Sequence, residues 1–210
     1  MSRWLPLVLA AYLVGSISFS YLVVRVLTGR DVRAEGSGNA GATNALRVAG
    51  KGAGAAALLL DVAKGAGAVA AARLLGAPPV VVAVTAAAVV VGHVWPLFLD
   101  LRGGKGVATA AGALGVLAPV PSLLAAVVFL AVVGVTRFVS LGSMLGVASF
   151  PLFVFLSQRL GWEEHDPAFV AGSVLVPALV LFKHRSNARR LLAGSERRLG
   201  ERAPSGEREG

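Results

Sequence analysis

Seven apolar runs dominate the sequence and leave only short polar joints between them. A helix needs about 20 apolar residues to cross a bilayer. Apolar residues make up 56% of the 210 positions and glycine adds 26 more, well above the roughly 45–50% typical of soluble proteins. We therefore predict an all-α polytopic membrane protein with seven transmembrane helices, forming one integral-membrane domain over 1–193 and a polar, frayed tail over 194–210. The runs cover 4–27, 53–76, 80–99, 107–118, 120–136, 144–157 and 168–182.

The run over 107–136 decides the topology, because it is long for one crossing and short for two. Pro119 and Pro121 interrupt it, so we expect two short helices, the fourth and fifth, that turn near 118–121. This choice collects sixteen basic residues on one side and leaves Arg3, Arg73 and Arg159 on the other. The positive-inside rule then predicts an external N-terminus and a cytoplasmic C-terminus. The sixteen are Arg25, Arg30, Arg33, Arg47, Lys51, Arg102, Lys105, Arg137, Lys183, Arg185, Arg189, Arg190, Arg197, Arg198, Arg202 and Arg208.

The net charge of +9 and the pI near 11.2 would also suit a nucleic-acid-binding protein. The basic residues lie in the joints between apolar runs, however, so we attribute them to membrane orientation and expect no nucleic-acid partner. The chain contains no cysteine and only three histidines. This composition excludes disulfides and thioester intermediates on the enzyme, and we expect neither a metal nor a cofactor.

The first polar joint contains the segment GSGNAGATNALR, from Gly36 to Arg47. Its G-x-G-x-x-G spacing is not a dinucleotide site, because an apolar membrane helix rather than a strand precedes it. Glycines of this kind instead free backbone N–H groups to face an anion. Arg47 can grip a phosphate with two hydrogen bonds, and further donors come from Ser37, Asn39, Thr43 and Asn44.

The second joint places Lys105 among Gly103, Gly104 and Gly106. A Walker site is excluded, since Ser or Thr must follow the lysine there and this chain has Gly106. A glycine-rich loop that opens an apolar helix can still bind an anion at the helix N-terminus. Nearby His93 suits a structural role as well as a functional one.

The later joints contribute two further groups of polar residues. Ser140 and Ser143 follow Arg137, an arrangement that is ordinary for a loop. His184 and Asn187 are spaced i, i+3 and would share one face of a helix leaving the membrane. Arg189 and Arg190 first indicate anchors at the membrane interface, and Glu196 is expected to be a structural partner for one of these cations.

Asp61 and Lys64 lie inside the second apolar run, about 12 Å from its start at 1.5 Å per residue. Charges in lipid are costly and usually paired. At i, i+3 the two can pair with each other, and we favour this structural role over a catalytic one. Gly50–Gly54 and Gly142–Gly146 have the GxxxG spacing of close helix contacts.

Three segments together resemble the motifs of one family: SGNAGATNALR, GHVWPLFLDLRGGKGVATAAG and HRSNARRLLAGSE. They are similar to those of the acyl-phosphate-dependent glycerol-3-phosphate acyltransferases of bacterial membranes, the PlsY family. The resemblance implies seven helices, motifs that face the cytoplasm, and location in the bacterial plasma membrane. It also implies transfer of a fatty acyl group from acyl phosphate to the 1-hydroxyl of glycerol 3-phosphate, which yields lysophosphatidic acid and phosphate.

By this resemblance each motif residue takes an expected role in a monomeric enzyme. The expected catalytic residues are Ser37, Arg47, Lys105, His184 and Asn187. The expected substrate-binding residues are Gly38, Asn39, Gly41, Thr43, Asn44, Gly103, Gly104, Gly106 and Ser143. The expected structural residues are Asp61, Lys64 and Glu196.

Two questions stay open at this point. The hydroxyl proton could pass to His184 or to a substrate phosphate, and a protonated His184 could instead join Arg47 and Lys105 as a phosphate-binding cation. A small transporter of phosphate-bearing anions would use the same cations and glycines. Transporters place their substrates near the bilayer midplane, whereas most polar motifs here lie at one interface, which favours the enzyme.

Overall fold

The computed structural model describes residues 2–201, and this part of the chain contains helices and no strands. After a short 3₁₀ turn, η1 (Ser2–Trp4), the first apolar run forms two helices rather than one, α1 (Leu5–Ser16) and α2 (Phe19–Thr28). The chain is extended at Ile17 and Ser18, and the Ser18 hydroxyl accepts a bond from the N–H of Tyr21 at 3.4 Å. At this break the ammonium group of the buried Lys64 donates hydrogen bonds to the carbonyls of Gly15 and Ile17.

The second run begins earlier than the apolar pattern indicated. Helix α3 covers Ala42–Leu74, so that its first turns include part of the first motif, and it kinks at Gly50. Gly50 has φ of 86° and ψ of −177°, a conformation that only glycine adopts readily. The kink folds 42–49 against the rest of α3, where Gly54 packs closely on Leu46.

The middle of the chain forms α4 (Pro79–Val94), a 3₁₀ turn η2 (Leu97–Leu99), α5 (Val107–Leu117) and α6 (Pro119–Thr136). The expected turn is present, since only Ala118 separates α5 from α6. Helix α5 is short, about 16 Å at 1.5 Å per residue. The prediction that the next helix is also short is wrong. Pro119 and Pro121 lie in the first turn of α6, where proline is tolerated, and the helix continues for 18 residues.

The last part of the chain contains α7 (Val139–Arg159), α8 (Pro167–Gly172), α9 (Leu175–Lys183) and α10 (Arg185–Leu192). Among the described residues, five segments are long and apolar enough to cross a bilayer, namely 2–28, 42–74, 79–99, 119–136 and 139–159. Helix α5 and the broken pair α8–α9 are the shorter apolar segments.

Reciprocal glycine contacts pack two of the helix pairs. Gly65 on α3 and Gly112 on α5 each approach the backbone of the other helix so closely that a Cβ atom would overlap a carbonyl oxygen. Gly15 on α1 and Gly92 on α4 do the same. Such small-residue contacts let helices approach closely in lipid.

Of the two GxxxG pairs singled out in the sequence, Gly142 and Gly146 lie against Phe129 of α6, and Gly142 also contacts Val133. Gly50 marks the kink in α3 instead, with open space where a Cβ atom would lie.

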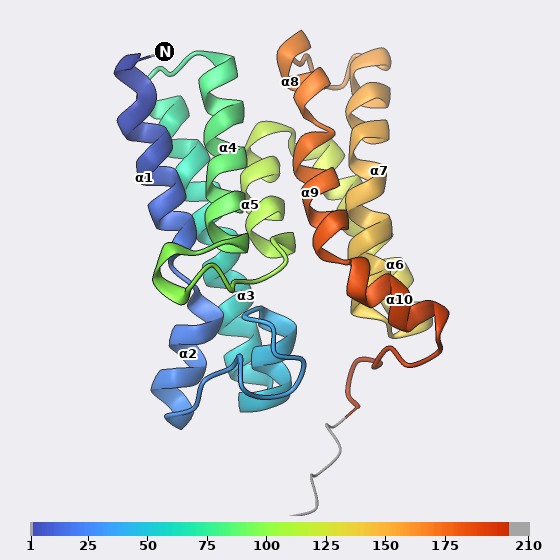
Figure 1. The fold of residues 1–210 in the computed structure, drawn as a ribbon. Coiled ribbons are helices and arrows are strands. Elements are labelled where there is room, and N and C mark those ends of the chain that lie inside the picture. Colours follow the sequence, from blue (N-terminus) through green and yellow to red (C-terminus); the bar gives the residue numbers. More distant parts are fainter. Residues whose placement is uncertain (1, 202–210) are drawn as a thin grey trace, which may run out of the picture.

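The joints gather at two opposite ends of the bundle (Figure 1). The N-terminus, the α3–α4 joint and α8 lie at one end. The loop over 29–41, the α6–α7 joint and α10 lie at the other, which we call the motif end. The loop over 95–106 lies level with the α1–α2 break, and the Tyr12 hydroxyl on α1 donates to the carbonyl of Trp95 at 2.9 Å. The first and third motifs thus lie at the motif end, whereas the loop of the second motif lies deeper in the bundle.

Candidate active site

Asn44, in the first turn of α3, shapes the loop that carries the first motif. Its Oδ1 accepts a hydrogen bond from the N–H of Ser37 at 2.8 Å. Its Nδ2 donates to the carbonyls of Val32 and Glu35, at 2.7 and 3.0 Å. Asn44 is only 1% exposed, and these three bonds occupy most of its amide. Its contacts therefore hold the glycine loop in place.

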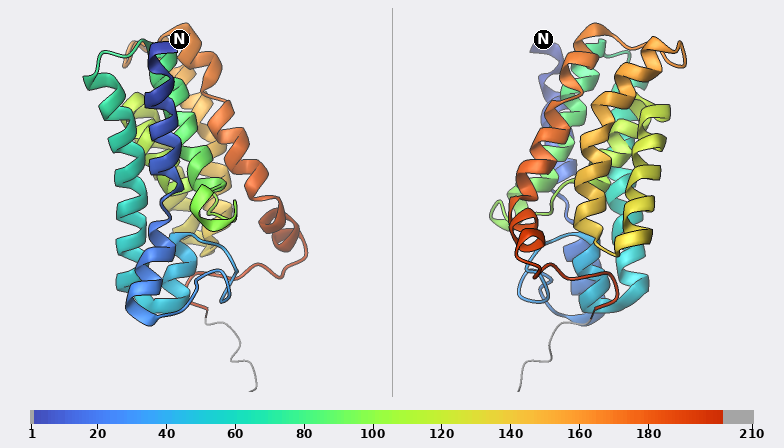
Figure 2. Two further views of the ribbon diagram at one scale, coloured as in Figure 1. Left: turned by 60° about the vertical axis from the view of Figure 1, so that its left-hand side comes forward. Right: turned by 90° about the vertical axis from the view of Figure 1, so that its right-hand side faces the viewer.

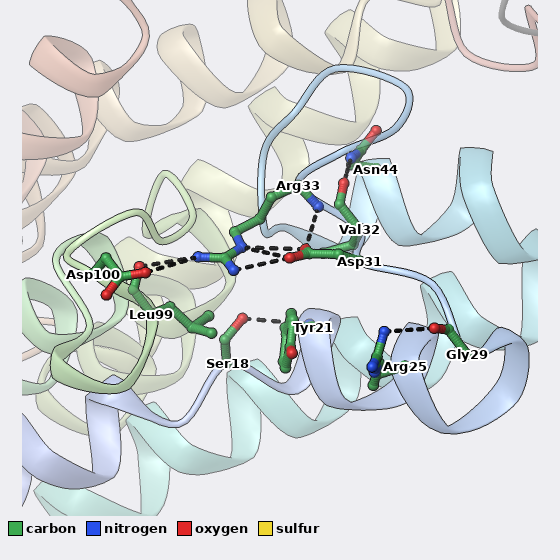
Figure 3. A network of polar contacts seen from close by, with 10 residues as sticks. All are labelled: Ser18, Tyr21, Arg25, Gly29, Asp31, Val32, Arg33, Asn44, Leu99 and Asp100. Carbon is green, nitrogen blue, oxygen red and sulfur yellow. Dashed lines mark hydrogen bonds and ion pairs between the residues drawn. The ribbon is translucent and has the colours of Figure 1, made fainter.

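Arg33 joins the first motif loop to the second (Figure 3). Its guanidinium donates to both carboxylate oxygens of Asp31, at 2.8 Å for Nη2, and to the carbonyl of Leu99 at 3.1 Å. The hydrogen bonds from Arg33 hold the pKa of Asp31 below its usual value against the opposing effect of burial. Because Leu99 precedes the second glycine loop by only a few residues, the hydrogen bond from Arg33 to its carbonyl fixes the two loops relative to each other.

Gly103 and Gly104 pack the second loop on the end of α4. A Cβ atom at Gly103 would overlap the carbonyl of His93, and one at Gly104 would overlap the His93 ring. The N–H of Gly104 donates to the same carbonyl at 3.1 Å. Gly106 has φ of 87° and begins α5. The loop thereby directs Lys105 away from α4, toward α10.

Lys105 and Asn187 connect the second motif to the third. The Lys105 ammonium donates to Oδ1 of Asn187, and Nδ2 of Asn187 donates to Oε1 of Glu196 at 2.6 Å. Burial lowers the pKa of Lys105 to about 8, although the charge of Glu196 opposes this change. Lys105 is therefore protonated at neutral pH but loses its charge more easily than an ordinary lysine.

Glu196 binds three side chains from two helices. Besides Asn187, it accepts from the hydroxyl of Ser140 and from Nε of Arg190, both at 2.7 Å. Burial acts to raise the pKa of Glu196, but these hydrogen bonds outweigh it and lower the pKa. The carboxylate thus ties α7 to α10 beside the lysine.

His184 lies at the joint between α9 and α10, and it is 3% exposed. Its Nδ1 lies 2.8 Å from the carbonyl of Val180. A carbonyl can only accept, so Nδ1 carries the proton and Nε2 of the neutral ring is an acceptor. Burial lowers the pKa of His184 to about 4, with the nearby Lys105 adding to the effect. His184 is therefore neutral at pH 7 in this structure, which favours a hydrogen-bonding role over that of a third phosphate-binding cation.

A cavity of about 440 Å³ opens where these motifs meet. Of the residues expected to form the site, Gly38, Gly103, Gly104 and Lys64 do not line it. Ser143 lines it, although its hydroxyl donates to the carbonyl of Val139 at 2.8 Å. The expected residues that do line it are Ser37, Asn39, Gly41, Thr43, Asn44, Arg47, Asp61, Lys105, Gly106, Ser143, His184, Asn187 and Glu196.

Asp61 and Lys64 are paired as expected, at 2.9 Å, and form a larger buried cluster at the base of the cavity. The Lys64 ammonium also donates to the carbonyls of Gly15 and Ile17, at 3.1 and 2.6 Å, across the α1–α2 break. It lies 3.0 Å from Nδ1 of His93, whose other face supports the second glycine loop. The cluster therefore links the broken first run to the loop of Lys105.

Sequence reasoning missed several lining residues from the C-terminal part of the chain. Arg190, Ser195 and Arg197 line the cavity, and so does Ser140. The arginines were counted only as topology signals, because a basic residue beside a membrane helix is ordinary. Contrary to the expectation of a frayed end from 194, the N–H of Leu199 bonds to the carbonyl of Arg137 at 2.7 Å. Residues 202–210 of that predicted tail lie outside the described residues.

Within residues 2–201, no group of three His, Cys, Asp or Glu side chains lies close enough to hold a metal ion. The cavity instead presents cations, hydroxyls and amides, which suits phosphate groups. Its other lining is apolar, with Leu58, Val107, Phe129 and Val139.

Comparison with known proteins identifies the family. A family model described as glycerol-3-phosphate acyltransferase matches residues 5–194. The chain belongs to the glycerol-3-phosphate acyltransferase family. A relative of that name from Clostridioides difficile (strain 630) is 42% identical over 204 residues, covering 95% of this chain and 97% of its own. Another from Myxococcus xanthus (strain DK1622) is 48% identical over 193 residues, covering 91% and 97%.

A solved structure of this acyltransferase family has the same fold. The crystal structure of PlsY, an integral membrane glycerol 3-phosphate acyltransferase in its glycerol 3-phosphate form, is 37% identical and superposes with a TM-score of 0.86. The match covers 94% of this chain and 96% of PlsY. A second PlsY structure, in a lysophosphatidic acid form, is 35% identical with a TM-score of 0.83, covering 93% and 95%. The acyltransferase described here is therefore an integral membrane protein.

Proposed function

We propose that this acyltransferase moves a fatty acyl group from acyl phosphate to the 1-hydroxyl of glycerol 3-phosphate, giving lysophosphatidic acid and phosphate. Family membership and the glycerol 3-phosphate and lysophosphatidic acid forms of PlsY support the acceptor and the product. The observation that carries the choice of donor is the cavity itself, which brings Arg47 and Lys105 together beside two glycine loops. Such a site suits two phosphate groups.

Two phosphate-bearing substrates need these cations in order to meet. Two groups of charge −2 at about 6 Å repel each other by roughly 11 kcal/mol at an effective dielectric constant of 20. One cation at about 4 Å recovers roughly 4 kcal/mol per unit of opposing charge at that dielectric constant. Arg47 and Lys105 supply two such charges, and N–H groups of the 36–43 loop and of the α5 N-terminus add further donors.

The reaction needs no covalent intermediate on the enzyme. The hydroxyl oxygen of glycerol 3-phosphate attacks the acyl carbonyl carbon and forms the new ester bond. The bond between the acyl carbon and the phosphate oxygen breaks, and phosphate leaves with that electron pair. Lys105 and Arg47 stabilise the charge that develops on the leaving phosphate.

The hydroxyl proton passes in this proposal to a substrate phosphate. A buried imidazole with a pKa of about 4 is a weak base, whereas a phosphate monoester ionises for the second time near pH 6. The better base is therefore the substrate. Nε2 of His184 acts instead as a hydrogen-bond acceptor that orients the glycerol hydroxyls.

The apolar side of the cavity accounts for the acyl chain. Leu58 on α3 lines the cavity and is 47% exposed. Phe129 of α6 and Val107 of α5 line the same cavity. A fatty chain can therefore lie against these helices with its end in lipid while its phosphate stays among the cations.

The remaining expectations are part of the same proposal. The protein crosses the bacterial plasma membrane seven times, counting α5 and the pair α8–α9. The motif end faces the cytoplasm, as the distribution of basic residues along the sequence favours under the positive-inside rule. A single catalytic domain acts as a monomer, and it extends past the expected boundary at 193, because Ser195, Glu196 and Arg197 line the cavity.

The choice of acyl donor tests the proposal. Purified protein in detergent or nanodiscs is given glycerol 3-phosphate with either acyl phosphate or acyl-coenzyme A, and the lipid product is identified by mass spectrometry. We expect 1-acyl lysophosphatidic acid and an equal amount of phosphate from acyl phosphate only. A preference for acyl-coenzyme A would contradict the assignment of the donor, and no product from either would contradict the function.

A further inference from the structure

The C-terminal segment after α10 turns back under the helices as far as Glu201, its last described residue (Figure 2). The N–H of Leu199 donates to the carbonyl of Arg137, and the Arg137 guanidinium donates to the carbonyl of Leu199, both at 2.7 Å. The Arg198 guanidinium lies 5.2 Å from the centre of the Phe138 ring. Together with the bonds of Glu196, these contacts hold the chain on both sides of Arg197.

Arg197 itself has an unsatisfied donor at the cavity. Its side chain lines the cavity, and its Nη1 is buried without a hydrogen-bond partner in the described part of the protein. Nearly all buried polar groups in proteins have a partner, and a guanidinium offers five donors that cannot be deprotonated near neutral pH. An acceptor that enters the cavity would satisfy this group.

The charges around the cavity favour an anion as that acceptor. The Arg190 charge is compensated by Glu196, at 2.7 Å. Arg47 and Arg197, by contrast, form no ion pair within residues 2–201, and they lie close enough to repel each other. Two uncompensated guanidiniums that face one cavity match a dianionic phosphate, which accepts paired hydrogen bonds from arginine.

We propose that Arg197 binds a phosphate group of one of the two substrates, so that the C-terminal segment forms one wall of the active site. This inference rests on the proposed function. It assigns a substrate-binding role to a residue outside the three motifs as the sequence defines them, which end at Glu196. The fold delivers the arginine from the cytoplasmic tail rather than from a membrane helix.

Steady-state kinetics of Arg197→Gln test this assignment, with Arg189→Gln as the matched control. Arg189 carries the same charge, but it is exposed on α10 and does not line the cavity. We expect Arg197→Gln to raise the KM of one substrate roughly tenfold or more, the loss of one charge-assisted hydrogen-bonded contact. Its kcat should change less than its KM, and Arg189→Gln should match the wild type. The KM that rises identifies whether glycerol 3-phosphate or acyl phosphate is bound.

Unchanged KM values for both substrates in a folded Arg197→Gln protein would overturn the inference. Arg197→Lys keeps the charge but loses the planar fork, so it should give an intermediate KM at the wild-type thermal midpoint. If Arg197→Gln does not fold, the KM of Arg197→Lys tests the inference instead, and a wild-type KM for both substrates in that variant would overturn it.

Calorimetric binding of inorganic phosphate separates this inference from the proposed function. Weaker phosphate binding by Arg197→Gln than by wild type supports the site even if the wild type forms no lysophosphatidic acid. Equal phosphate binding by the two proteins would overturn the site even if turnover is normal.

Discussion

The Lys105 ammonium donates a hydrogen bond to the side-chain amide of Asn187, a residue 82 positions further along the chain. Through Asn187 the lysine is connected to Glu196, and through Glu196 to Ser140. The bond joins the second glycine loop to the joint after the last apolar helix. Lys105 is thereby held at the cavity.

Replacing Lys105 and Asn187 together should lower the rate by less than the product of the two single effects. We expect Lys105→Met and Asn187→Ala each to lower kcat/KM for glycerol 3-phosphate at least 100-fold, because each loses the oriented cation. The double variant should be much less impaired than the product of the two effects, as for residues that act as a unit. Initial rates of the four proteins measure this, with Ser186→Ala as an exposed control. Full additivity would show that the bond has no role in turnover.

The lowered pKa of Lys105 predicts a loss of acceptor binding at alkaline pH. With a pKa of about 8 in the free enzyme, the ammonium is charged at pH 7 and neutral well above pH 8. The substrate phosphate remains a dianion throughout this range. The value of kcat/KM for glycerol 3-phosphate, which reports the free enzyme, should therefore fall as the pH rises through 8. A profile that stays level to pH 9.5 would contradict this.

Lys105→Arg provides the control for that profile. Arginine keeps its charge throughout, so the alkaline fall should be absent in this variant whatever its rate at pH 7. A fall of the same size in Lys105→Arg would assign the ionisation to another group.

The neutral state of His184 predicts that it does not control the acid limb of the rate. Because its pKa is about 4, the ring does not ionise between pH 5 and 7. The fall of kcat/KM toward acid pH should instead follow the substrate phosphate near pH 6. We expect His184→Asn to lower the rate by about 100-fold but to keep the midpoint of the limb. Disappearance of the limb in that variant would identify His184 as the general base.

Removing Lys64 should destabilise the bundle. Lys64→Met leaves the buried Asp61 carboxylate without its ion pair and leaves two carbonyls at the α1–α2 break without a donor. Breaking a buried pair in this way costs about 3–5 kcal/mol. We expect a large fall in thermal midpoint in detergent, whereas Lys51→Met, at an exposed position of the same helix, should leave it nearly unchanged. Equal thermal midpoints for the two variants would contradict the role of Lys64 in stabilising the bundle.

Gly104→Ala should impair turnover although Gly104 does not line the cavity. The added Cβ atom would overlap the His93 ring and lie 3.0 Å from the carbonyl of Ala40. The loop must shift, and a displacement of about 1 Å at Lys105 can cost roughly 100-fold in rate. Gly52→Ala is the control, since a Cβ atom there meets nothing within 4 Å. Wild-type rates in Gly104→Ala would show that the loop does not depend on this contact.

The all-helical class and most element positions could be predicted from the sequence because lipid imposes long apolar runs. Charge distribution and Pro119 also led to the helix pair at 107–136. The sequence could not reveal the break at Ile17 or the early start of α3. The break depends on a long-range partner, since the Lys64 ammonium donates to the carbonyls of Gly15 and Ile17. The early start of α3 depends on the kink at Gly50, which packs Leu46 against Gly54.

The site was predictable where one segment contains the whole signal. Arg47, Lys105 and His184 line one cavity, as the three motifs suggested. The sequence did not show which motif residues face the cavity and which hold the loops in place. Gly104 packs against His93, and Asn44 bonds to the backbone of the first motif loop. The charge state of His184 and the position of Arg197 depend on burial and on the turn of the tail, which no local pattern encodes.

The central claim is that the cations of this one cavity join the two phosphate-bearing substrates for direct acyl transfer. The most direct measurement is the initial rate of lysophosphatidic acid formation from acyl phosphate and glycerol 3-phosphate, by the wild type and by Arg47→Gln at equal folded protein. We predict product and phosphate in equal amounts from the wild type, and a rate at least 100-fold lower from Arg47→Gln. A wild-type protein that forms no product, or an Arg47→Gln protein that keeps the wild-type rate, would contradict the account.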